Sequence, residues 1–183
     1  SSSSWCLLLE NIFLFVYDLG TPSYKIWACF LTFSSILFHS CKGEEDININ
    51  IRYIFGHLDA LAIVGICSYY TFCIQLIAVS SCIIYSILIN IDYINEEYYK
   101  YIVYIIGLST FIKNTIEVLN MCNKYNTYIY IGLFSMFIGH ILFGYKKGKL
   151  YLGKYSLINR WIWHLNCANY MIMSGYNINQ LLP

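Results

Sequence analysis

The sequence predicts an all-α, multi-pass integral membrane protein: a single domain over residues 1–183, built as a bundle of seven transmembrane helices. Of the 183 residues, 58% are hydrophobic and only 11% are charged. A soluble domain carries about 25% charged residues, so this composition excludes a soluble or disordered chain. Seven spans of ~20 residues use ~140 residues and leave room for short loops only. The net charge of +1 gives no reason to expect nucleic acid as a partner; the expected environment is the lipid bilayer.

Charged residues mark the limits of the first spans. Spans are expected at 5–17 and 24–41, separated by a turn-forming segment that contains Gly20 and Pro22. The positions between Asp59 and Asp92 then carry no charge at all. They correspond to about 50 Å of helix at ~1.5 Å per residue, too long for a single crossing. We therefore expect two short helices joined by a tight turn, with one long tilted helix as the alternative.

The later spans are expected at 100–119, 128–145 and 161–176. If the long uncharged run forms one helix, the bundle has six spans instead of seven. The eight cysteines form no C-x-x-C pair and lie mostly within apolar runs, where a thiol packs as a small hydrophobic group. A disulfide framework is therefore not expected.

Four histidines lie near span ends, and the alternation of spans places them toward the same membrane face: His39, His57, His140 and His164. Asp59 follows His57 by two residues. Ionisable groups within a bilayer are costly and mark candidate functional sites. Imidazole and carboxylate both suit Zn²⁺, whose catalytic sites use three protein ligands and a water. The alternative is that the histidines hydrogen-bond between helices or lie at headgroup depth.

Several short segments resemble, in order, the motifs of one family. Residues 35–41 read S-x-x-x-H-x-C, which resembles a motif of the transmembrane protein 8/myomaker family. That family belongs to the CREST superfamily of seven-helix proteins, with the alkaline ceramidases and adiponectin-type receptors. Residues 9–13 (L-E-N-I-F) resemble the family's first-span L-S-N-x-x-F. Asp59, Gly65 and His164 stand where the family has its aspartate, its glycine and the last histidine of H-x-x-x-H.

The resemblance implies a zinc-dependent hydrolase that acts on an amide or ester bond of a lipid substrate. His39 and His164 would hold the zinc, while Ser35 and Asp59 would orient or activate the water. Judged without the resemblance, Ser35 is a helix hydroxyl bonded to its own backbone. Asp59 is then an acidic residue favoured by the dipole at a helix start.

One departure from the family pattern concerns the third ligand. The first histidine of H-x-x-x-H is replaced by Arg160, whose guanidinium cannot bind zinc. His140 is the first candidate for a replacement ligand, because the sixth span ends at the face where the seventh begins, and His57 is the second. The lost ligand favours an alternative function, that of a non-catalytic membrane-remodelling or fusion-related protein of the myomaker type.

Two further alternatives concern the class of protein and one acidic residue. Helices interrupted by glycine and proline would indicate a transporter or channel. The chain has only two prolines, so this class is the weaker alternative. Glu10, within the first span, either points into the bundle or pairs with a basic residue of a neighbouring helix.

Overall fold

The computed structural model describes residues 5–41, 49–90, 105–110, 112–113, 116–117 and 156–181. This part of the chain is helical with short turns and contains no strand, which confirms the all-α prediction for it. Its helices are α1 (Leu7–Val16), α2 (Pro22–Cys41), α3 (Ile49–Phe72), α4 (Gln75–Asn90) and α7 (Ser156–Leu181), with further helical residues between 105 and 117. The predicted span at 128–145, including His140, lies outside the described residues.

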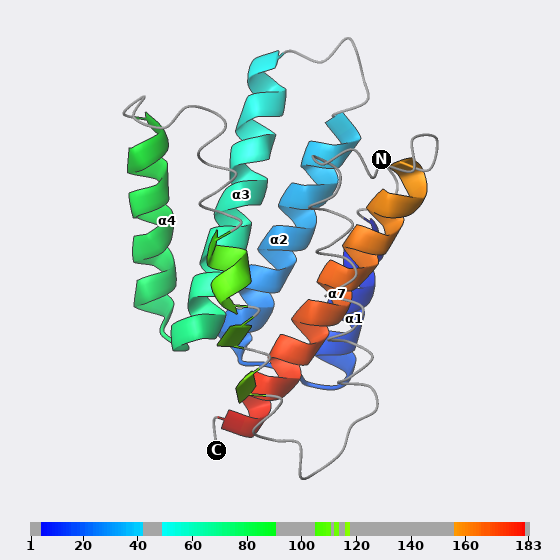
Figure 1. The fold of residues 1–183 in the computed structure, drawn as a ribbon, viewed down its shortest axis with the longest axis vertical. Coiled ribbons are helices and arrows are strands. Elements are labelled where there is room, and N and C mark those ends of the chain that lie inside the picture. The colour runs from blue at the N-terminus through cyan, green and yellow to red at the C-terminus, as the bar shows by residue number, and fades with distance from the viewer. Residues whose placement is uncertain are drawn as a thin grey trace.

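The helices pack side by side (Figure 1). α1 contacts α7 and α2, α2 contacts α3, and α3 contacts α4. The end of α2 and the beginnings of α3 and α7 lie at the upper end of the bundle in Figure 1. Residues near these helix ends are therefore close in space although they are far apart in sequence.

One described helix is long and apolar enough to cross a membrane. It covers Tyr53–Phe72, 20 residues with a mean hydropathy of 1.3. The apolar helices α1 and α4 have 10 and 16 residues, or ~15 and ~24 Å, which is shorter than a hydrocarbon core of ~30 Å. α2 and α7 have 20 and 26 residues and are long enough to cross the hydrocarbon core. Neither is a candidate spanning helix, because the mean hydropathy of its described residues is too low. The described residues therefore contain one candidate spanning helix rather than seven.

The long uncharged run forms two helices, as predicted. α3 ends at Phe72, and Cys73 takes a positive φ of 54° while its N–H donates to the Tyr69 carbonyl at 2.6 Å. A left-handed residue stops the helix, so α4 can start at Gln75 and run back along α3. The beginning of α3 differs from the prediction, because the helix starts at Ile49 and not near Asp59. A single arginine such as Arg52 does not interrupt a helix, since its helix propensity is high.

Close packing between α2 and α3 depends on Gly65. The indole ring of Trp27 lies over Gly65, where a Cβ atom would overlap the ring. The Trp27 Nε1–H donates to Gln75 Oε1 at 2.9 Å, which also fixes the beginning of α4. The ring thus joins α2, α3 and α4.

Replacing Gly65 with alanine should lower the free energy of unfolding by ~1–3 kcal/mol, because the added methyl group overpacks the contact with Trp27. Gly107→Ala is the matched control, since nothing lies within 4 Å of a Cβ at that position. That change should be neutral or stabilising, as alanine favours helix over glycine by ~1 kcal/mol. Thermal unfolding of the purified protein in detergent measures both. Equal effects of the two substitutions would contradict this account of the α2–α3 contact.

A polar network closes the bundle at the end opposite to the histidines. The Lys113 ammonium donates to the carbonyls of Tyr70 and Thr71 at 2.8 and 2.7 Å and pairs with Glu117 at 3.3 Å. These carbonyls belong to the last turn of α3, where a cation is favoured by the helix dipole. The Tyr70 hydroxyl donates to Glu117, and Asn177 Nδ2 of α7 donates to the Tyr70 hydroxyl at 3.4 Å. The network ties α7 to the end of α3.

Candidate functional site

His39 and His164 are in ring contact at the upper end of the bundle. His39 lies in the last turn of α2, and His164 lies in the third turn of α7. Their ring centroids are 4.8 Å apart with the planes at 79°. His164 is buried, with 4% of its surface exposed, and His39 is half-buried beside Phe38. The structure thus brings together two of the three histidines that the sequence analysis assigned to zinc.

The spacing of this pair fits two ligands of one zinc ion. Imidazole nitrogens bind zinc at ~2.0–2.1 Å, and in a tetrahedral site this places two ring centres about 5 Å apart. Within the described part of the chain, however, no group of three or more His, Cys, Asp or Glu side chains is arranged to hold a metal ion. The donor set seen here therefore fits part of a zinc site. His140, the first candidate for a third ligand, lies outside the described residues.

Ser35 and Asp59 lie on the inner side of the bundle at the same end. Ser35 is buried and precedes His39 by four residues, so both lie on one face of α2. Asp59 lies in α3, and its Oδ1 is buried.

His57 lies in α3. Its ring packs edge-on against Tyr53, one turn earlier on α3, with centroids 4.1 Å apart. Tyr53 has 51% of its surface exposed. His57 itself is half-buried, and this ring contact lies within α3.

Glu10 points into the bundle, which decides between the two alternatives for this residue. Its side chain is completely buried, and no described basic residue pairs with it. The nearby Thr32 hydroxyl donates to the Leu7 carbonyl at 3.3 Å and accepts from Asn11 Nδ2 at 2.7 Å. Neither carboxyl oxygen of Glu10 has a hydrogen-bond partner among the described residues. Burial of such a group without a hydrogen-bond partner lowers the stability of the fold.

A buried polar column leads from the histidines into the bundle. Thr32, Ser35 and His39 follow one another at spacings of three and four residues, which places them on one face of α2. Thr32 lies ~10 Å deeper than His39 at 1.5 Å per residue, and Glu10 lies beside it. The carboxyl of Glu10 also acts electrostatically on Cys167. Thr32 and Cys167 each lie three residues from a predicted site residue, Ser35 and His164, and this helical spacing is the signal in the sequence that places them beside the site.

Comparison of the chain with family models, with curated proteins and with solved structures found no match. The proposals below rest on the geometry of the described residues and on the resemblance of short motifs.

Proposed function

We propose that the chain is a multi-pass membrane protein whose histidine pair belongs to a zinc-dependent site for hydrolysis of an amide or ester bond in a lipid. The contact between His39 and His164 carries this proposal. The two residues come from helices that are far apart in the sequence. Their rings have the spacing expected for two ligands of one zinc ion. The resemblance of the motifs around His39, Asp59 and His164 to those of CREST proteins supports the same function.

Each residue of the site has a role that follows from its position. Zinc, when bound, would supply a Lewis acid for the carbonyl group and would lower the pKa of a water molecule. The Asp59 carboxylate would accept the proton from the attacking water and return it to the leaving amine or alkoxide. The Ser35 hydroxyl, one turn deeper than His39, would donate a hydrogen bond to the carbonyl oxygen. The apolar side chains of the bundle would exclude bulk water from the reaction.

A second candidate is the non-catalytic membrane-remodelling or fusion-related function of the myomaker type. Arg160 favours it, because arginine stands where the superfamily has a zinc ligand. In this alternative the contact between His39 and His164 serves to pack α2 against α7, since histidines also join helices within membranes.

Lipid hydrolysis by the purified protein separates the two candidates. The protein in nanodiscs is supplied with lipid amides and esters, and released fatty acid is measured by mass spectrometry. Wild-type protein should release fatty acid until a chelator is added. Asp59→Asn should lower the rate by ~10²–10⁴-fold, the usual contribution of a general base, without loss of bound zinc. Asp18→Asn is the matched control, because Asp18 is 91% exposed and pairs with Lys25 at the other end of the bundle.

Two outcomes would contradict the hydrolase proposal. One is wild-type protein that releases no fatty acid from any lipid amide or ester, which would favour the non-catalytic candidate. The other is Asp59→Asn protein that is as active as wild type, which would remove Asp59 from the reaction.

A further inference from the structure

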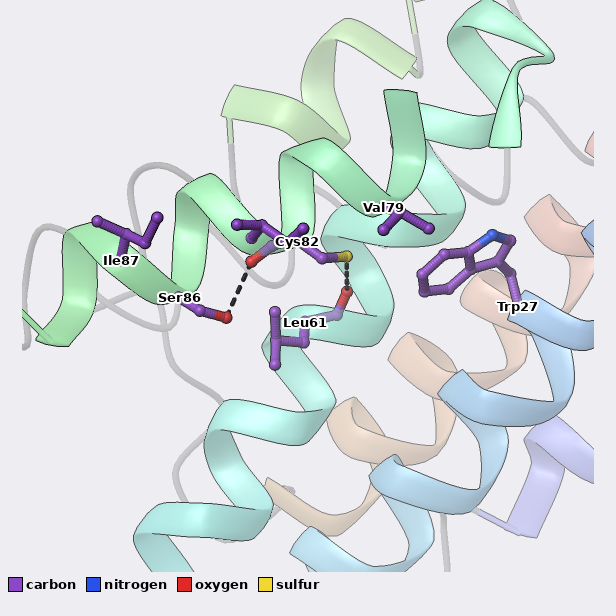
Figure 2. A pocket seen from close by; sticks show the side chains of 7 residues that line it. Trp27, Leu61, Val79, Cys82, Ser86 and Ile87 are labelled. Atoms are coloured by element: carbon purple, nitrogen blue, oxygen red, sulfur yellow. Dashed lines mark hydrogen bonds between the residues drawn. The ribbon is translucent and has the colours of Figure 1, made fainter. Parts of the chain in front are cut away.

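An open groove of about 550 Å³ lies between α3, α4 and the Trp27 indole of α2 (Figure 2). Leu61 lines it from α3, and its α4 side is formed by Val79, Cys82, Ile83, Ser86 and Ile87. Asp59 and Leu61 are two residues apart and so point to opposite sides of α3. The groove therefore lies on the face of α3 opposite to Asp59, and its volume is that of a small-molecule site.

The polar atoms that line the groove are already hydrogen-bonded within the protein. Cys82 Sγ donates to the Leu61 carbonyl at 3.5 Å, and Ser86 Oγ donates to the Cys82 carbonyl at 2.9 Å (Figure 2). The Trp27 Nε1–H is bonded to Gln75. No lining residue is charged. The groove thus offers a ligand few hydrogen-bonding groups and a lining that is almost entirely apolar, which fits hydrocarbon better than a peptide, an ion or a polar headgroup.

The surroundings of the groove are also apolar. The outer side chains of α4 beyond it include Ile84 and Leu88, which are 57% and 38% exposed. α3 contains the candidate spanning segment Tyr53–Phe72. A hydrocarbon chain can therefore enter the groove from the side without leaving an apolar environment.

The shape of the groove is elongated. Figure 2 shows Trp27 and Val79 at one end and Ile87 at the other. Ile87 follows Val79 by eight positions in α4, which corresponds to a length of ~12 Å along the helix. The Trp27 ring, held over Gly65, is only 9% exposed.

We propose that this groove binds one acyl chain of a membrane lipid, with the chain in contact with the Trp27 indole. The driving force is burial of apolar surface on both sides, the lining side chains and the hydrocarbon. The site is separate from the histidine pair, and it does not depend on zinc or on hydrolysis.

Quenching of Trp27 fluorescence by brominated lipid tests the proposal. Trp5, Trp161 and Trp163 are replaced with phenylalanine, and the protein is placed in nanodiscs of phosphatidylcholine with either brominated or ordinary acyl chains. Bromine quenches by contact, so Trp27 emission should be lower with brominated chains than with ordinary chains. Val79→Phe, which fills the groove beside the ring, should remove most of that reduction. Ile84→Phe, the same kind of change at an outer position of α4, should leave it intact.

Ser86→Leu fills the groove away from the ring and should weaken the quenching as well, which provides a second test if Val79→Phe does not fold. The proposal is overturned if emission is the same with brominated and ordinary lipid. It is also overturned if both groove-filling variants are quenched as strongly as the parent protein. Absence of quenching together with two chains in each disc would assign the groove to a second copy of the protein instead.

Discussion

Alanine at either His39 or His164 should lower the affinity of the purified protein for zinc by more than ~100-fold, beyond the ~10–100-fold usual for residues that only support a ligand. The reason is that the two imidazoles, 4.8 Å apart between ring centres, would supply two of the three protein ligands. Zinc affinity is measured by competition with a chelating dye, and metal content by plasma mass spectrometry after purification without a chelator. His57→Ala in the same assay tests the second candidate for the third ligand, whose ring packs against Tyr53 at the same end of the bundle.

Thermal unfolding of the same variants shows whether a loss of zinc reflects a lost ligand or a lost fold. A contrary outcome is that the wild-type protein and the three alanine variants all carry the same amount of zinc. In that case any bound metal lies elsewhere, and the histidine pair is a packing contact between α2 and α7. The single variants thus decide whether the pair binds metal.

Arg160→His should raise the affinity for zinc by ~10–100-fold, because it restores a histidine one turn before His164 on the same face of α7. Arg160→Gln is the matched control, since it removes the positive charge without adding a ligand. Zinc affinity is measured by competition with a chelating dye in detergent. A gain with glutamine equal to that with histidine would show that the guanidinium charge, and not the missing imidazole, limits binding.

His140→Ala tests the competing possibility that His140 replaces the lost ligand. In that case it should lower zinc content as much as His39→Ala does, and Arg160→His should add little, because three ligands are already present. If the third ligand has been lost, His140→Ala should leave the zinc content unchanged. A retained third ligand therefore predicts a loss of zinc with His140→Ala and little gain with Arg160→His. A lost third ligand predicts no loss with His140→Ala and a gain with Arg160→His.

The positions of the charged residues predicted the break between α3 and α4. An uncharged run longer than one crossing predicted a break, and the structure places it at Cys73 and Ile74. α3 starts at Ile49, well before the uncharged run that follows Asp59, because a helix accommodates Arg52. Membrane crossing by seven helices remains a prediction, since the described helices include one apolar enough to span.

The alternation of helix directions placed His39 and His164 at one end of the bundle before any coordinates, and the structure brings the two rings into contact. The inward position of Glu10 could not be predicted, because Glu10 and Asn11 are the only polar residues of α1 and the sequence does not show which neighbouring helix they face. The groove beside Trp27 depends on the packing angle of α3 and α4 and on the missing side chain at Gly65. Such a feature is a property of the assembled helices and has no signal in local sequence.

The most direct test of the account is the zinc content of the wild-type chain, purified in detergent without a chelator. The account predicts about one zinc per chain, removed by a chelator and restored by added zinc, as expected for a site built on His39 and His164. Wild-type protein that carries no zinc and takes up none would contradict the hydrolase proposal and leave the histidine pair as a contact between helices.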